Sequence, residues 1–350
     1  MKLDDIIHST GEWLKGTGPN ANIVISSRIR LARNLSKVPF PNRSTKKQLA
    51  EVLTTVEHAF SEIDMFQGSM FLNLSELDNV DKQFLVERHL MSHEHAAGGE
   101  GKALIVSKEE MISVMINEED HLRVQGLQSG FNLNEIWKIV NLLDDSLSQK
   151  LDYAFASDWG YLTACPTNTG IAMRGSVMLH LPALVMTKQI NKVLAAIAKL
   201  SFASRGFYGE GTQATGNFFQ ISNQVSLGHS EEDIIQNING LIRQVIEQEE
   251  QARQALLLQN RSMLEDKIYR SFGILKNAHI ISSQETVELL SMVRIGIDVG
   301  MVKDVDRKAI NELFIMIQPA HLQKIEGKKL SSNERDSRRA TLIREKLGGK

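Results

Sequence analysis

The segment from Asn117 to Arg123 carries acidic and basic side chains suited to an anionic substrate that must lose a proton. Polar and apolar residues alternate from His121 to Leu127, which predicts a half-buried strand whose every second side chain shares a face. Glu119, His121 and Arg123 would then project together. A carboxylate accepts protons and a guanidinium binds anions. A salt bridge on a solvated strand explains this segment alone equally well.

Four further arginines occupy separate motifs. Arg28 and Arg30 lie two residues apart and would share one face of a predicted strand, whereas Arg174 and Arg205 follow later in the chain. Arginine forms planar, bidentate hydrogen bonds to phosphate oxygens, and several arginines together can replace a glycine-rich loop. Each alone is typical of a surface ion pair. Together with Arg123 they predict a binding site for a phosphorylated ligand.

The usual glycine-loop and metal motifs are missing from the sequence. Residues 98–103 (GGEGKA) resemble a Walker loop but lack its first glycine and its magnesium-binding hydroxyl. His89, His93, Glu94 and His95 cluster locally, but they lack the H-E-x-x-H spacing, which favours an exposed helix end over a metal site. We therefore expect no metal ion held by protein ligands.

The composition indicates a soluble, cytoplasmic protein. An apolar fraction of 42% is enough for a buried core, and 350 residues suggest two domains, or one large domain with an appendage. The single cysteine, Cys165, excludes an internal disulfide, as expected in a reducing compartment. The first ten residues contain no apolar segment typical of a secretory signal, and no apolar run is long enough to predict a membrane span. We expect neither membrane binding nor direct nucleic-acid binding.

The charges are distributed unevenly. Residues 251–350 contain 18 Lys and Arg against 12 Asp and Glu, although the net charge of the whole chain is only −2. A basic C-terminal region beside an acidic body predicts anionic partners for the tail, or docking of the two regions on each other. Solvated helical surface explains the asymmetry about equally well.

Two regions of the chain differ in their predicted elements. Strands are predicted at residues 23–31, 103–106, 112–116, 121–127, 153–156, 176–181, 203–207 and 218–222, with helices at 44–63, 80–95, 133–151 and 187–200. Ser230 then caps a long helix to about Asn260, and helices follow at 262–275, 283–296, 305–317 and 332–346. We therefore predict an α+β domain at residues 1–249 and a helical domain at residues 250–350.

Five segments in order resemble the phosphagen (guanidino) kinase family: SSRIRLARNL, VERHLMSHEH, NEEDHLR, CPTNTGIAMRGSV and RGFYGEGTQATGNFFQISNQVSLGHSEED. Together they cover residues 20 to about 249. The resemblance implies a curved antiparallel sheet flanked by helices. It also implies transfer of the ATP γ-phosphoryl group to a guanidinium nitrogen, with Mg²⁺.

The resemblance also implies roles for individual residues. It assigns the nucleotide phosphates to Arg28, Arg30, Arg123, Arg174 and Arg205, the adenine to His89, and the substrate guanidinium to Glu119, Glu210 and Cys165. Met178 departs from the family, which often has an adenine-contacting histidine at this position; His180 lies nearby in the sequence.

Two departures point to one branch of the family, the bacterial protein-arginine kinases. Only 25 residues precede Ser26, where phosphagen kinases have a helical domain whose loop closes over a small substrate, so we expect a site open to arginine on a polypeptide. The C-terminal region is a helical addition, and its Arg335, Asp336 and Arg339 match an R-D-x-x-R-A motif that the branch associates with allosteric sensing of phosphoarginine. Without the resemblance, a salt-bridged helix face explains that spacing.

The branch implies a set of partners and a cellular role. Phosphoarginine would mark proteins for a Clp unfoldase and protease in the bacterial stress response, and the heat-shock repressor would be one substrate. A zinc-binding adaptor would activate the kinase, and the chain would form a homodimer. Two alternatives stay open: a kinase for free arginine, and an inactive module that binds phosphoarginine.

Overall fold

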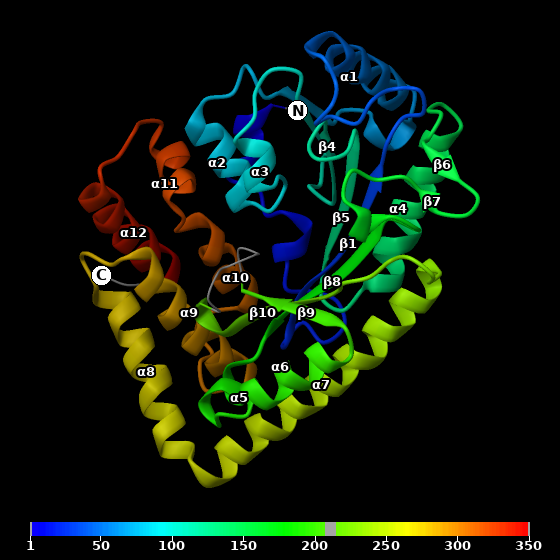
Figure 1. Ribbon diagram of the computed structural model, residues 1–350. Coiled ribbons are helices and arrows are strands. Elements are labelled where there is room, and N and C mark those ends of the chain that lie inside the picture. The colour runs from blue at the N-terminus through cyan, green and yellow to red at the C-terminus, as the bar shows by residue number, and fades with distance from the viewer. Residues whose placement is uncertain (1, 207–214, 349–350) are drawn as a thin grey trace.

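A single antiparallel sheet organises the molecule. The computed structural model describes residues 2–206 and 215–348 (Figure 1). Within them the strand order is β2-β3-β4-β5-β1-β8-β10-β9, and every neighbouring pair is antiparallel. The strands are β1 (Val24–Arg33), β2 (Met70–Asn73), β3 (Ala103–Val106), β4 (Ile112–Ile116), β5 (Leu122–Ser129), β8 (Met173–His180), β9 (Phe202–Arg205) and β10 (Phe218–Asn223). A separate hairpin pairs β6 (Phe155–Ala156) with β7 (Gly160–Tyr161). The predicted α+β class is confirmed.

Helices cover the sheet and then form the C-terminal region. In the first part they are α1 (Lys46–Ser61), α2 (Asn79–Glu87), α3 (His93–Ala96), α4 (Leu133–Ser148), α5 (Pro182–Met186) and α6 (Ile190–Lys199). The long α7 (Glu231–Gln259) leads to α8 (Arg261–Asn277), α9 (Ser283–Asp298), α10 (Arg307–Met316), α11 (Pro319–Glu326) and α12 (Ser332–Leu347). The predicted Ser230 cap is present, since its side chain accepts a hydrogen bond from the amide of Asp233.

Two glycines let helices approach the central strands closely. A Cβ atom on Gly126 of β5 would lie 2.4 Å from Val140 of α4, and one on Gly175 of β8 would lie 2.7 Å from Ile238 of α7. Because any side chain would push these helices outward, glycine at both positions fixes α4 and α7 against one face of the sheet. Arg28 and Arg30 of β1, Arg123 of β5 and Arg174 of β8 line a cavity.

Several sequence predictions were wrong in detail. The helix predicted at residues 80–95 ends at Glu87, because His89 adopts a positive φ of 59°, and a new short helix starts after Ser92. The strand predicted from residue 121 begins at Leu122, so Glu119 lies in the turn between β4 and β5 and shares no strand face with Arg123. β2 and α11 were not predicted.

The C-terminal helices dock on the first part of the chain. The buried guanidinium of Arg294 donates to the carbonyl oxygens of Ala21 and Asn22, and the buried carboxylate of Glu87 accepts from the amides of Ala320 and His321. The helix α7 runs without interruption through the predicted boundary at residues 249 and 250. Docking, one of the three explanations offered for the charge asymmetry, is therefore present.

No helix in the described part of the chain combines the length and the apolar character needed to cross a bilayer.

Three buried histidines predict acid sensitivity. Burial lowers the pKa of His95 and His121 to about 4 and that of His321 to about 3. Below about pH 6.5 the unfolded chain therefore binds protons that the folded chain does not, and stability falls as the pH falls. Replacing His321 with Gln should reduce the loss of unfolding free energy between pH 7.5 and pH 5 by about 2 kcal/mol. Urea denaturation at both pH values measures this, and equal losses in both proteins would contradict it.

Candidate active site

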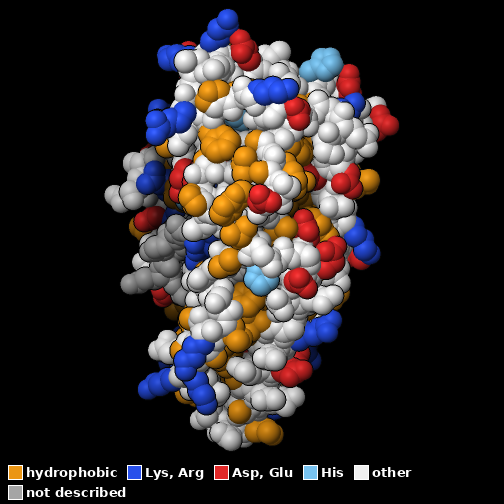
Figure 2. All heavy atoms as spheres, turned by 45° about the vertical axis from the view of Figure 1, so that its right-hand side comes forward, with side chains coloured by type: hydrophobic (Ala, Val, Ile, Leu, Met, Phe, Trp, Pro, Cys, Tyr) orange, Lys and Arg blue, Asp and Glu red, His pale blue; other side chains and the backbone are white. Residues whose placement is uncertain are grey.

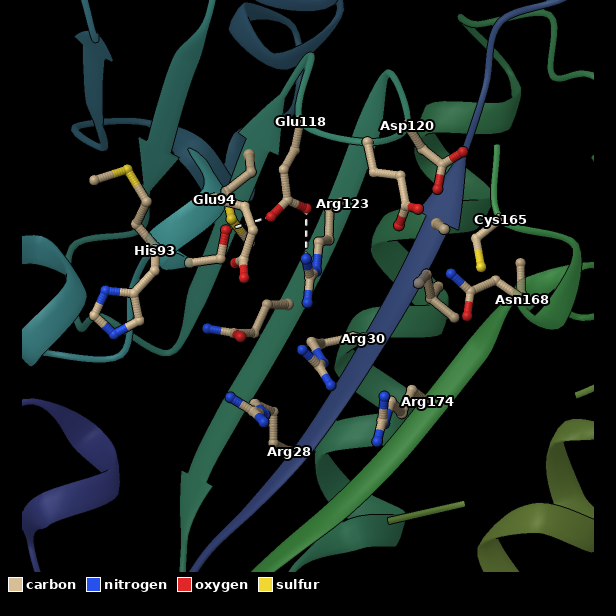
Figure 3. A pocket seen from close by; sticks show the side chains of 18 of the residues that line it. Arg28, Arg30, His93, Glu94, Glu118, Asp120, Arg123, Cys165, Asn168 and Arg174 are labelled. Atoms are coloured by element: carbon tan, nitrogen blue, oxygen red, sulfur yellow. Dashed lines mark hydrogen bonds and ion pairs between the residues drawn. The ribbon is translucent and has the colours of Figure 1, made fainter. Parts of the chain in front are cut away.

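Residues far apart in the sequence line one cavity of about 680 Å³ above the sheet (Figure 3). Among the predicted site residues, those lining it are Arg28, Arg30, His89, Glu119, Arg123, Cys165, Arg174 and Arg205. The sheet register explains the gathering of arginines, because Arg30 of β1 is paired with Arg174 of β8 while Arg123 on β5 is paired with Ala32. The five predicted arginines therefore belong to one site, which we call the arginine cage.

The arginine cage is short of negative charge. Desolvation, followed by the charges of the other cage arginines, lowers the pKa of Arg28 to about 9 and that of Arg30 well below its usual value. The Nε atom of Arg30 is buried and donates no hydrogen bond within the described residues. An anion bound in the cage would relieve both penalties. These residues therefore fit a polyphosphate group.

The acidic turn between β4 and β5 contains three carboxylates in different environments. The side chain of Glu118 is only 4% exposed and forms an ion pair with Arg123 at 2.5 Å, and it also accepts a hydrogen bond from Ser92. Asp120 is buried and accepts hydrogen bonds from the amide of Ala164 at 2.7 Å and from the side chain of Asn34 at 2.6 Å. Only Glu119 of the three has no hydrogen bond or ion pair with another described residue.

The environment of Glu119 suits a proton acceptor. Partial burial, followed by the neighbouring carboxylates of Asp120 and Glu118, raises the pKa of Glu119 above its usual value. A carboxylate with a raised pKa holds a proton more readily, which general-base catalysis requires. The sequence analysis singled out Glu119 but missed the supporting roles of Glu118 and Asp120, although all three lie in the same heptapeptide.

Cys165 faces the cavity from a loop that the acidic turn holds in place. Its Sγ atom lies 3.0 Å from Oγ1 of Thr167, and its carbonyl accepts a hydrogen bond from Thr163 at 2.7 Å. Because the amide of Ala164 donates to Asp120, the Cys165 loop and the acidic turn are connected directly. Figure 3 shows Cys165 and Asp120 on the same side of the cavity.

His89 lines the cavity beside Arg28. It also lines a narrow extension, together with Trp13, Met178 and others, and its ring contacts that of Trp13 edge to face at 5.0 Å. Burial, followed by the charge of Arg28, lowers the pKa of His89 to about 3, so the ring is neutral. His180 does not reach this extension, because its Nε2 atom lies 2.8 Å from Ser291. The extension has a volume of only about 20 Å³ and presents the neutral ring of His89 and the thioether of Met178.

Four predicted residues are not placed in the cavity. Glu210 lies outside the described residues. Arg335, Asp336 and Arg339 lie on α12 and do not line the cavity. The guanidinium of Arg339 is buried, where it donates to the carbonyl oxygens of Ile317 and Ile281 and pairs with Asp336. The tail motif is therefore separate from the arginine cage.

Comparisons with known proteins match the first part of the chain and the C-terminal region to two different family models. Residues 51–252 match the family model of the ATP:guanido phosphotransferase C-terminal catalytic domain, and residues 261–350 match that of the protein-arginine kinase McsB C-terminal domain. The protein-arginine kinase of Halothermothrix orenii is 49% identical over 99% of both chains. That of Bacillus subtilis is 47% identical over 99% of this chain and 96% of its own.

Solved structures of similar fold include a lombricine kinase, with a TM-score of 0.60, 24% identity, and coverage of 73% of this chain and 77% of that one. The duplicated taurocyamine kinase of Schistosoma mansoni, with bound transition-state analogue components, also has a TM-score of 0.60, at 21% identity over 86% of this chain and 52% of its own. At this identity the two structures establish the fold alone.

Because the buried charges of the arginine cage repel one another, replacing one of its arginines should have opposite effects on stability and on anion binding. Replacing Arg28 with Gln removes one buried positive charge, so the ligand-free protein should unfold at the same or a higher temperature. Its affinity for tripolyphosphate should fall at least about tenfold, because one charge-assisted contact is lost. Thermal unfolding and calorimetric titration measure the two effects.

The exposed Arg270, which pairs with Asp266 on α8, supplies the matched control. Arg270→Gln should leave tripolyphosphate binding unchanged. Unaltered affinity in Arg28→Gln would show that the cage does not bind the anion.

Proposed function

Because this chain belongs to the ATP:guanido phosphotransferase (phosphagen kinase) family, we propose that it transfers the terminal phosphoryl group of ATP to arginine side chains of proteins. Membership of the family makes the chain a kinase, and it confirms the resemblance drawn from the five motifs. The observation that carries the proposal is that the arginine cage and the carboxylate of Glu119 line the same cavity. Glu119 has no hydrogen bond or ion pair with another described residue. A full-length likeness to protein-arginine kinases supports a protein as the acceptor.

The reaction requires a guanidinium to become a nucleophile. A free guanidinium has a pKa above about 12 and is protonated, so it must lose a proton as the N–P bond forms. In the proposed mechanism Glu119 accepts that proton while the bond between the γ-phosphorus and the bridging oxygen breaks, and ADP leaves. The arginine cage balances the charge that spreads over the phosphoryl oxygens.

The residues around the cavity have distinct proposed tasks. Glu118 aligns Arg123, and Asp120 fixes the distance between the acidic turn and the Cys165 loop. We assign Cys165 and Glu210 to the substrate guanidinium and His89 to the adenine, as the family motifs imply. Magnesium would enter with the nucleotide, because the described residues contain no group of three metal-binding side chains.

Glu119→Gln tests the mechanism. The variant keeps the size of the side chain but cannot accept the proton, so turnover should fall about 10²- to 10⁴-fold while ATP affinity stays near that of the parent. Glu57→Gln, a similar change on the exposed face of α1, is the control. Turnover near that of the parent in Glu119→Gln would contradict the role of Glu119.

The acceptor is tested by offering Mg-ATP with either free arginine or an unfolded, arginine-rich protein. Acid-labile phosphate on the protein supports the proposal. Labelling of free arginine alone would identify a small-molecule kinase, and no labelling of either would identify an inactive phosphoarginine-binding module.

We propose that the tail motif senses phosphoarginine, with unequal contributions from its residues. The buried Arg339 holds α12 against Ile317 and Ile281, whereas Arg335 is partly exposed and donates to the carbonyl of Leu330. Arg339 therefore supports the fold, and Arg335 with Asp336 is better placed to meet a ligand.

The two arginines should differ in mutagenesis. Arg339→Ala should lower the free energy of unfolding by about 2–4 kcal/mol, because it leaves buried carbonyl oxygens without donors. Arg335→Ala should keep near-parental stability and lose any change of activity on adding free phosphoarginine. Denaturant titration and kinase assays with and without phosphoarginine separate the two roles, and equal stability of the two variants would contradict the assignment.

The cellular proposals follow from the family branch. We propose a cytoplasmic enzyme of the bacterial stress response that acts as a homodimer and is activated by a zinc-binding adaptor. Its phosphoarginine products, including the heat-shock repressor, would be delivered to a Clp unfoldase.

A further inference from the structure

Four large apolar side chains are exposed on the outer side of the Cys165 loop. Phe155 and Trp159 belong to the β6–β7 hairpin and are 59% and 58% exposed, while Val225 and Leu227 follow β10 and are 50% and 44% exposed. We call these four residues the outer rim. Figure 2 views the molecule with the right-hand side of Figure 1 turned forward, and it shows apolar side chains at the surface of this face.

Both parts of the outer rim are joined to the Cys165 loop by hydrogen bonds to its carbonyl oxygens. The amide of Tyr161 donates to the carbonyl of Gly170 at 2.8 Å, and Ser226 donates to the carbonyl oxygens of Thr167 and Asn168. A Cβ atom on Gly170 would lie 2.9 Å from the backbone of Leu227, so the segments touch with no room for a side chain. Thr167 and Asn168 also line the cavity. The loop thus has one side toward the cavity and the other toward the outer rim.

The hairpin is held rigidly while its aromatic side chains face outward. The guanidinium of Arg33 lies over the ring of Tyr161 at 3.5 Å and forms a buried ion pair with Asp144 of α4 at 2.7 Å. The amide of Leu162 donates to the carbonyl of Ala154 and closes the hairpin. Because the inward side chains fix the hairpin, the exposure of Phe155 and Trp159 is not a sign of loose packing.

The two segments that carry the outer rim contain acidic residues and no lysine or arginine, although Lys37 lies 3.8 Å from one of those acids, Asp152. Residues 152–162 and 224–233 contain five Asp and Glu and no Lys or Arg. Asp158 and Glu232 are exposed and form no ion pair with another described residue. The rim is therefore apolar and acidic, which complements a basic chain with apolar residues and disfavours an acidic one.

We propose that the outer rim binds the polypeptide that carries the target arginine, at the residues flanking that arginine. The proposal rests on the proposed function, since it places the arginine side chain between Glu119 and Cys165. Trp159 precedes Cys165 by six residues, so the rim lies within about 20 Å of the cavity, the span of about six extended residues. The rim selects extended, basic segments with nearby apolar or aromatic residues, as found in unfolded proteins.

The experiment compares a long acceptor with a short one. The double variant Phe155→Ser and Trp159→Ser should lower kcat/KM for an unfolded, arginine-rich protein at least about tenfold, mainly through KM. It should leave kcat/KM for a blocked Gly-Arg-Gly tripeptide and the affinity for ATP unchanged, because neither ligand reaches the rim. Leu258→Ser with Ile280→Ser, which removes apolar side chains 86% and 70% exposed on the C-terminal region, is the matched control.

Other outcomes overturn the proposal. An equal loss with both acceptors would mean that the rim acts only by shaping the Cys165 loop. A shift of the double variant to a smaller species in sedimentation, with the loss of activity, would identify a second copy of the chain as the occupant. Unchanged kinetics with the long acceptor would leave the rim without a role.

A binding measurement separates this proposal from the proposed function. The inactive Glu119→Gln protein, with and without the two rim substitutions, is titrated with the unfolded protein. Weaker binding in the rim variant supports the rim even if turnover cannot be measured, and equal binding overturns it. A parent enzyme that phosphorylates neither acceptor would overturn the proposed function instead.

Discussion

The mutual repulsion of five guanidinium groups is the constraint on which the rest of the site depends. Gathering these charges in a partly desolvated cavity lowers the pKa of Arg28 and Arg30 and opposes folding. A sheet tolerates this arrangement because β1, β5 and β8 are held by backbone hydrogen bonds on both sides and by α4 and α7 beneath. An anion in the cage would relieve the desolvation and repulsion of Arg28 and Arg30, so the arrangement favours anion binding.

The acidic turn shows how one carboxylate is kept available among three. Glu118 is neutralised by Arg123, and Asp120 is occupied by the amide of Ala164 and by Asn34. Glu119 lies between them, and its neighbours raise its pKa. The same contacts connect the turn to the Cys165 loop, and that loop contacts the outer rim. The proposed base, the proposed acceptor site and the proposed docking surface are thus parts of one connected structure.

The C-terminal helices contact the segment that carries His89 into the cavity. Three consecutive residues at the end of α2 point to different parts of the molecule. Glu87 accepts from the first amides of α11, Arg88 forms a buried pair with Glu110, and His89 lines the cavity. A displacement of α11 would therefore be felt at His89 through a single turn of backbone. The hydrogen bonds of Glu87 thus connect the helical region to the wall of the cavity.

The sequence by itself determined the types of chemistry and most of the elements. The alternation of polar and apolar residues located most strands, and a capping residue located the long helix that begins after Ser230. The motif arginines and Glu119 were recognisable because their chemistry depends on residue type and local spacing. The sequence could not show that Glu119 lies in a turn, that His180 turns away to Ser291, or that Arg339 is committed to backbone carbonyls. His180 and Ser291 are 111 positions apart, and Arg339 binds carbonyl oxygens 22 and 58 positions away, so these contacts are set by the fold and not by local spacing. Only the tertiary structure decided which carboxylate stays unpaired and which apolar side chains remain outside, because both are set by what the rest of the chain covers.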